Sequence, residues 1–150
     1  MKNFRFMLLA AVAAIGFSNA ALASSGPEIS AQNAGTTKGL VLVPIGAGGV
    51  FETVAQNDGG AGLVYVQASV TGIDGAAIAI CPSGSAAGCL PALGSPAQTS
   101  ATFVSGQTDI FVVAISAAKV KSLSSGTAYV TFFDSHWCVI GATSVPVVVN

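Results

Sequence analysis

The chain has 150 residues, of which 52% are hydrophobic and 7% are charged, and its formal net charge at pH 7 is −1. Because Lys2 and Arg5 lie at the very start, the rest of the chain carries three lysines, six acidic residues and no arginine. Nucleic-acid binding needs a basic surface, and phosphate is usually bound by arginine or lysine side chains. This composition therefore argues against nucleic acid as a partner.

Residues 1–23 have the pattern of a secretory signal peptide. A short basic region, Met1–Arg5, precedes an apolar core of 12 residues, Phe6–Phe17, and Ala21-Leu22-Ala23 fits the small-x-small cleavage rule. A membrane-spanning helix needs about 20 apolar residues, so this core is too short to span. We expect cleavage after Ala23, with cleavage after Ala20 as the second choice. The mature chain should then be exported to the periplasm, the cell surface or the medium, with no membrane span.

The mature chain divides into a polar arm and a domain rich in strand patterns. Residues 24–37 (SSGPEISAQNAGTT) are small and polar, and they predict a flexible N-terminal arm. Residues 38–150 predict a single β-domain, because short apolar or alternating segments are separated by turn signals such as NDGG and DG. The expected strands are 40–43, 50–56, 63–71, 76–81, 99–104, 109–116, 127–134 and 137–149. Residues 82–96 predict a loop, and residues 117–125 predict a helical turn.

Eight short strands with turn signals about every 8–12 residues are typical of an antiparallel sandwich or barrel. Two segments add a resemblance: Gly126–Phe132 (GTAYVTF) and Gly141–Val149 (GATSVPVVV). They resemble the two closing strands of bacterial immunoglobulin-like domains, which often read G-x-A-x-V-x-F, a turn, and V-P-V-x-V. The resemblance implies an all-β, antiparallel immunoglobulin-like β-sandwich of about seven to nine strands in a secreted or surface protein. It carries over no functional residue, because such domains share no catalytic site.

The segment FFDSHWCV, residues 132–139, holds the only histidine and the only tryptophan of the chain. If it is extended, one face carries Asp134, His136 and Cys138, and the other carries Ser135 and Trp137. A catalytic triad needs a serine next to the imidazole, and this parity separates Ser135 from His136; no G-x-S-x-G elbow supplies another serine. The segment is therefore interpreted as a half-buried strand, with Trp137 packed into the core. No catalytic residue is predicted.

The same segment also contains two possible metal ligands, His136 and Cys138. A zinc site of three thiolates and one imidazole would use Cys81, Cys89, His136 and Cys138. Blue copper would need a second histidine. In an exported chain disulfides compete for the thiolates, so no metal and no cofactor is predicted.

The three cysteines predict one disulfide bond. Cys81 and Cys89 flank seven small, flexible residues, and a C-x7-C loop can close on itself without strain. The first choice is a Cys81–Cys89 bond that leaves Cys138 as a buried free thiol. The alternative is a bond from Cys138 to Cys81 or Cys89 across the sandwich.

The predicted function is non-enzymatic: a secreted or cell-surface structural or adhesive subunit, pilin-like or adhesin-like. Its partners would be itself or other surface subunits, reached through sheet edges, and few charges would oppose self-association. In the pilin-like version the arm 24–37 would complete the sheet of the next subunit, with Ile29 and Ala31 pointing inward. The alternative is a small binding module for carbohydrate or another ligand, which would need an aromatic platform from Tyr65, Tyr129 and Trp137. An enzyme is the third reading, and the sequence specifies no small-molecule ligand.

Overall fold

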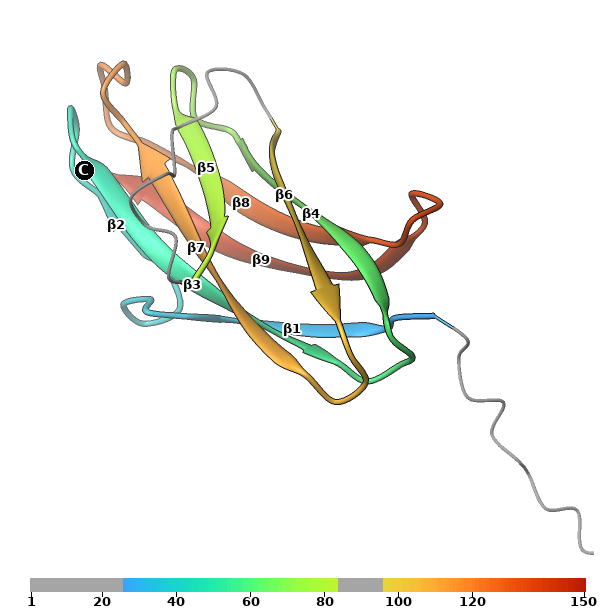
Figure 1. Cartoon of the computed structure of the whole chain (residues 1–150). Coiled ribbons are helices and arrows are strands. Elements are labelled where there is room, and N and C mark those ends of the chain that lie inside the picture. The colour runs from blue at the N-terminus through green and yellow to red at the C-terminus, as the bar shows by residue number, and fades with distance from the viewer. Residues whose placement is uncertain (1–25, 84–95) are drawn as a thin grey trace, which may run out of the picture.

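A computed structural model of the chain describes residues 26–83 and 96–150, and within these ranges it contains nine β-strands and no helix (Figure 1). The predicted signal peptide and Cys89 lie outside these ranges. The strands are β1 (Ile29–Ala34), β2 (Val41–Val43), β3 (Gly48–Asn57), β4 (Gly62–Thr71), β5 (Ala77–Pro82), β6 (Ala97–Phe103), β7 (Thr108–Ser116), β8 (Ser124–Phe133) and β9 (Val139–Val149). A search of the described residues for a helix able to cross a membrane accordingly finds none.

The strands form two sheets that face each other (Figure 1). The smaller sheet has the order β1-β3-β7-β5, and the larger sheet has the order β2-β9-β8-β4-β6. The predicted all-β class and strand number are confirmed. The antiparallel prediction needs one correction, because β2 pairs with β9 in parallel, with Val41 opposite Val147 and Val43 opposite Val149.

Alternation of small apolar and polar residues builds each strand. In β4 the side chains of Val64, Val66 and Ala68 are fully buried, whereas Tyr65 and Gln67 point to the other face. A strand places successive side chains on opposite faces, so this pattern sends one face into the core and leaves the other to solvent. The helical turn predicted for residues 117–125 is wrong: residues 117–123 form a loop, in which the Val120 amide donates to the Ala117 carbonyl at 3.0 Å, and β8 begins at Ser124.

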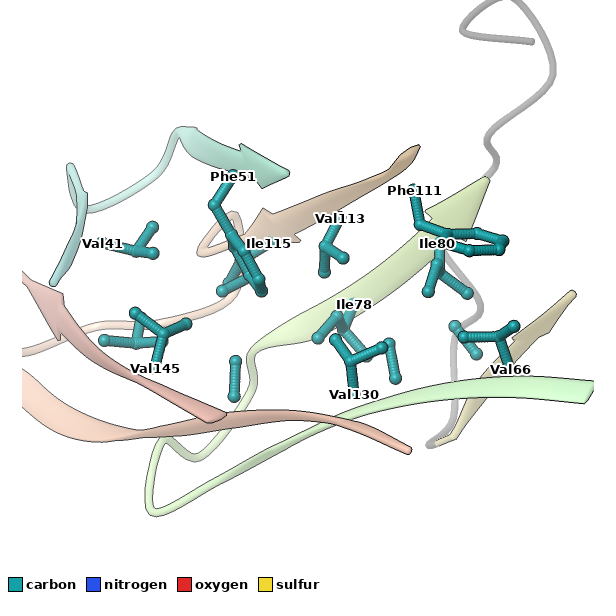
Figure 2. Packing of buried hydrophobic residues seen from close by; sticks show 14 of the residues in the cluster. Val41, Phe51, Val66, Ile78, Ile80, Phe111, Val113, Ile115, Val130 and Val145 are labelled. Atoms are coloured by element: carbon teal, nitrogen blue, oxygen red, sulfur yellow. The ribbon is translucent and has the colours of Figure 1, made fainter. Parts of the chain in front are cut away.

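The core lies between the two sheets and consists mainly of valine, isoleucine, alanine and phenylalanine side chains (Figure 2). Phe51 and Phe111 come from the smaller sheet, and Phe103 and Phe132 come from the larger one; all four are buried. The Phe111 ring lies 6.3 Å from Phe103 and 5.9 Å from Phe132 between centroids, the latter edge-on at 67°. Burying one such side chain contributes about 1.5–3 kcal/mol. Phe111 of the smaller sheet therefore contacts two phenylalanines of the larger sheet.

The predicted flexible arm is wrong over Ile29–Ala34, which form the edge strand β1. It pairs with β3 in antiparallel register from Ile29 opposite Asn57 to Ala34 opposite Glu52. The Asn33 side chain explains how a polar segment is held there. Its Nδ2 donates to Thr143 Oγ1 at 3.0 Å and to the Ser144 carbonyl at 2.9 Å, and its Oδ1 accepts from Thr53 Oγ1 at 3.0 Å. Polar side chains thus join β1 to β9 where apolar alternation is weak.

The two N-terminal strands, β1 and β2, belong to different sheets. β1 lies along the smaller sheet, and after a short connection β2 lies beside the end of β9, where Figure 1 also shows the C-terminus. The pairing of β2 continues past Val43, because the Asn150 amide donates to the Val43 carbonyl at 3.1 Å and the Ile45 amide donates to the Asn150 carbonyl at 2.9 Å. One edge of the sandwich is closed by the chain's own N-terminal segment.

Candidate functional site

The turn that joins β8 to β9, residues 134–138, is organised by one carboxylate. Asp134 Oδ1 accepts hydrogen bonds from the backbone amides of His136 at 2.8 Å and Cys138 at 2.9 Å. The Asp134 amide donates to the Cys138 carbonyl at 3.0 Å, and the Trp137 amide donates to the Asp134 carbonyl at 3.1 Å. An aspartate that binds backbone amides a few residues ahead is standard turn chemistry. FFDSHWCV is therefore a strand end followed by a folded turn.

Trp137 lies in this turn with a φ of 63°, and half of its side chain (50%) is exposed. The prediction that Trp137 fills the core is wrong. It assumed an extended segment, and the hydrogen bonds to Asp134 fold the segment instead. A positive φ is sparsely populated by bulky residues, and such conformations persist only where the surroundings fix them.

The surroundings that fix Trp137 are two aromatic rings, Tyr65 and Phe133. The indole is stacked on Tyr65 with centroids 4.8 Å apart and planes 8° apart, and it lies 5.6 Å from Phe133 at a tilt of 53°. Tyr65 of β4 and Phe133 of β8 lie directly opposite each other in the sheet, so strand pairing places them side by side. We call Tyr65, Phe133 and Trp137 the aromatic cluster.

The aromatic cluster lies on the outer face of the larger sheet. Leu63 on β4 and Val139 on β9 are exposed next to it, since Leu63 is two residues before Tyr65 and Val139 is opposite Phe133. Tyr129, also exposed, lies on the same outer face farther along β8, opposite Ser69. Of the three aromatics proposed for a platform, the structure brings Tyr65 and Trp137 together and leaves Tyr129 apart. Phe133 is not among the residues that the sequence predicted for this platform. The available signal was that Phe132 and Phe133 are adjacent on a strand, so they point to opposite faces.

A depression of about 440 Å³ adjoins the aromatic cluster. Its polar lining comes from Asp134, Ser135 and His136 of the turn, and its remaining lining comes from Gly26, Pro27, Ala61, Gly62, Leu63 and Ile140. Leu63 lies beside the aromatic cluster and also lines the depression, so the apolar cluster and the polar lining are neighbours. The His136 side chain is 84% exposed, which leaves its ring accessible to solvent.

The three polar side chains of the turn lie close together without forming a catalytic relay. Ser135 Oγ is 3.4 Å from His136 Nδ1, so the expectation that Ser135 and His136 point apart is wrong. The Asp134 carboxylate approaches the same nitrogen, with Oδ2 at 3.9 Å. A triad needs the serine and the acid on opposite ring nitrogens. Here both meet Nδ1, and this geometry cannot pass a proton from serine through the imidazole.

The electrostatics of the turn centre on the same carboxylate. The backbone hydrogen bond from Cys138 holds the pKa of the Asp134 carboxyl below its ordinary value of 3.8. Partial loss of solvent opposes this effect, while the amide and the imidazole of His136 reinforce it. Hydrogen bonds to an ionised carboxylate favour the charged form. Asp134 is therefore anionic at neutral pH.

Cys138 is a free and exposed thiol, which corrects its predicted burial. The alternative disulfide from Cys138 to Cys81 or Cys89 is not formed in the structure. Cys81 is buried at the end of β5. The Cys81–Cys89 bond stays a prediction, because Cys89 lies outside the described ranges. Within residues 26–83 and 96–150, no three His, Cys, Asp or Glu residues gather closely enough to hold a metal ion.

Comparison with known proteins identifies a fold and no family. No protein-family model and no curated protein matches the chain. Among solved structures, the chain is similar to the CARDB domain of a Pyrococcus furiosus protein, which was solved in complex with di-metal ions. That match has a TM-score of 0.55 and 12% identity, and covers 86% of this chain and 93% of that one. The N-terminal domain of PorA matches with a TM-score of 0.50 and 10% identity, over 81% and 98% of the two chains.

At these identities the similarities show the fold alone. Weaker similarities, with a TM-score of 0.43 each, are to a human PapD-like domain and a cohesin from Archaeoglobus fulgidus. The chain is a two-sheet β-sandwich that resembles immunoglobulin-like domains. The surface residues of this chain are therefore the basis for a functional proposal.

Proposed function

We propose that this chain is an exported, non-enzymatic surface module of the adhesive kind, which works by contact through the outer face of its larger sheet. The aromatic cluster carries this proposal. Large exposed apolar patches are uncommon on soluble domains and mark interaction sites. Tyrosine and tryptophan are also the residues that most often anchor recognition surfaces. Trp137 is half exposed in a turn built to hold it, which fits a contact residue better than a packing residue.

The adhesin-like version has more support than the pilin-like version. Donor-strand assembly needs an open sheet in each subunit and an arm that leaves its own domain. Here the arm is occupied within its own domain, because its strand β1 pairs along β3. The Asn33 side chain adds bonds from β1 to Thr143 and Ser144 of β9. An arm held in this way would have to break these contacts before it could serve a neighbouring subunit.

The turn chemistry supports a non-enzymatic role. Ser135 and Asp134 both approach Nδ1 of His136, so the chain's only imidazole is not arranged as a base for the adjacent serine. The same three side chains can still donate and accept hydrogen bonds at a contact surface. The low charge of the chain keeps electrostatic repulsion between surfaces small.

The test is surface display combined with adhesion. The full chain is expressed in a bacterial host, the processed protein is weighed by mass spectrometry, and intact cells are treated with a protease. We expect a mature protein that begins at Ser24 and is accessible on intact cells. Cells displaying it should adhere to other cells, and Trp137→Ser should reduce adhesion about tenfold.

Leu123→Ser is the matched control. Leu123 is 75% exposed and lies before the start of β8, whereas Trp137 follows the end of β8. The control removes an exposed apolar side chain of similar class from the far end of the same strand, and adhesion should be retained. Retention of the protein inside the cell, or adhesion that is indifferent to Trp137→Ser, would overturn the proposal.

A further inference from the structure

We infer that the aromatic cluster and the adjoining depression form a binding site for the neutral hexopyranose units of a glycan. This inference rests on the proposed function, since it names the ligand of the same surface. Small-ligand sites combine a mostly apolar surface with a few placed polar groups. The aromatic cluster and the depression beside the β8–β9 turn offer both, because Leu63, two residues before Tyr65 on β4, also lines the depression.

The ring of Trp137 is placed to accept the C–H face of a sugar. Tyr65 covers one face of the indole at 4.8 Å and 8°, so the exposed half of the side chain is left to the opposite face and the ring edge. The face of an aromatic ring carries negative charge density, and the C–H groups of a pyranose present positive charge density. Phe133, tilted by 53° beside the indole, supplies a second apolar wall.

The indole is fixed in place before any ligand arrives. Its residue has a φ of 63°, and the turn that imposes this φ is tied by the Asp134 carboxylate to the amides of His136 and Cys138. Rigid side chains lose little entropy on binding, so a preorganised ring strengthens affinity without adding contacts. Through Oδ1, Asp134 therefore fixes the backbone that carries Trp137.

The depression supplies the hydrogen-bonding edge that sugar hydroxyls need. Ser135 has a hydroxyl, and the exposed His136 ring has nitrogens that can donate or accept according to tautomer. Asp134 Oδ1 accepts from two amides, while its Oδ2 lies 3.9 Å from His136 Nδ1 and meets no other described partner. Hydroxyl groups are both donors and acceptors, so they match this mixed set better than a purely apolar partner does.

The charges select a neutral sugar over an acidic one. The described lining of the depression contains one carboxylate, Asp134, and neither lysine nor arginine. Lys119 and Lys121 line a different pocket beside Asp74, and Lys38 lies between β1 and β2. Acidic sugars such as uronic and sialic acids are usually held by arginine or lysine. A carboxylate at the rim would repel them.

Isothermal titration calorimetry of the purified chain tests the inference. The probes are maltohexaose, cellohexaose, laminarihexaose and mannohexaose as neutral glycans, and a hexamer of galacturonic acid and sialyllactose as acidic ones. We expect at least one neutral hexamer to bind with a Kd between about 10 µM and about 1 mM, and the acidic probes to bind at least about tenfold more weakly. Binding should also change the fluorescence of Trp137, the only tryptophan of the chain.

Variants locate the site. Trp137→Ala should weaken binding of the neutral hexamer at least about tenfold, and Trp137→Phe should restore part of it, because a ring without the indole still stacks. Leu123→Ala should bind like the parent chain. Circular dichroism of each variant confirms that the sandwich is retained, which keeps a loss of binding distinct from a loss of fold.

Four results would overturn the inference: no saturable binding of any neutral hexamer up to about 10 mM, binding indifferent to Trp137→Ala, tighter binding of the acidic probes, or a Trp137-dependent dimer in sedimentation that makes this face an interface between copies. The first result, combined with adhesion that still depends on Trp137, would leave the proposed function standing and reject the glycan. Loss of both would reject the proposed function as well.

Discussion

The indole of Trp137 lies parallel to the phenol ring of Tyr65, with 4.8 Å between centroids and 8° between planes. Tyr65 belongs to the middle of β4, and Trp137 to the turn that follows β8. The pairing of β4 with β8 brings Phe133 opposite Tyr65, and the folded turn then carries Trp137 back over both. A residue that the pattern assigns to the core thus becomes the most exposed aromatic of the described chain.

This arrangement predicts a modest effect of Trp137 on stability. Trp137→Ala removes one stacked pair and a half-exposed side chain, so we expect the free energy of unfolding to fall by about 1–2 kcal/mol. Phe111→Ala is the comparison, because Phe111 is fully buried between Phe103 and Phe132. It should cost about 3–5 kcal/mol. Urea denaturation of both variants decides the matter, and equal losses would mean that Trp137 is a core residue after all.

The Asp134 turn should respond to acid. Since the folded-state pKa of Asp134 is depressed, its contribution to stability is complete above the ordinary value of 3.8 and is lost as the pH falls through the lower folded-state pKa. The amide resonances of His136 and Cys138, followed by NMR from about pH 5 to about pH 2, should therefore shift together. In Asp134→Asn, whose amide oxygen still accepts both bonds, this titration should vanish. A titration that persists there would assign it to another group.

Asn57 should be among the most sensitive polar positions of the chain. Its buried amide accepts from the Glu28 amide at 3.0 Å and the Gly59 amide at 3.1 Å, and donates to the carbonyls of Gly60 at 2.8 Å and Val104 at 3.1 Å. Asn57→Ala leaves these groups without their partner, and a buried unsatisfied group costs about 1–3 kcal/mol. We expect a loss of about 2–4 kcal/mol in thermal or urea unfolding.

Gln56 supplies the control for Asn57, because it is the preceding residue of the same strand and its side chain is exposed. Gln56→Ala should change the free energy of unfolding by no more than about 0.5 kcal/mol. If the two variants lose equal stability, the hydrogen bonds of Asn57 do not hold the adjoining loops as described.

Gly141 should tolerate no side chain. A Cβ there would collide with the carbonyl oxygen of Ile29, because β9 passes directly beside β1. Gly141→Ala should push β1 away and cost about 1–3 kcal/mol. Hydrogen exchange should show faster exchange of the β1 amides than in the parent chain. Gly26→Ala, where an added Cβ meets nothing within 4 Å, is the control, and a similar response in both would contradict the close packing.

We expect Cys138 to be a reactive thiol and Cys81 and Cys89 to form a disulfide bond. Cys138 is free and exposed, so iodoacetamide should label it in the folded chain. Non-reducing peptide mapping should recover Cys81 linked to Cys89, as the C-x7-C spacing predicts. Recovery of Cys138 in a cross-linked peptide would favour the alternative pairing. Stoichiometric zinc on the purified protein would contradict both pairings.

Sequence patterns predict local extension well and predict distant pairing poorly. The alternation of Leu63–Thr71 gives β4 almost residue for residue. β1 is missed because its apolar alternation is weak and its attachment depends on Asn33 reaching β9, a contact that no local pattern contains. The position of β5 beside β7 rather than beside β4 is also a property of the assembled sheets.

The candidate site also could not be predicted fully from local sequence patterns. The segment FFDSHWCV stands out in the sequence, but the directions predicted for its side chains assume a straight strand. One carboxylate that binds two amides ahead of it changes the direction of every side chain from Ser135 to Cys138. The resulting contact between Trp137 and Tyr65 depends on strand pairing, and so it could be recognised only in three dimensions.

The parallel pairing of β2 with β9 sets an order on folding. β9 is the last strand of the chain, and it is needed both by β8 and by β2, one of the first strands to be made. Contacts between such distant segments form slowly, because the long intervening loop has to close before they stabilise anything. The larger sheet therefore cannot be completed before residues 139–149 have left the ribosome. For the exported chain that we propose, this delay would keep the polypeptide open for passage through a translocation pore.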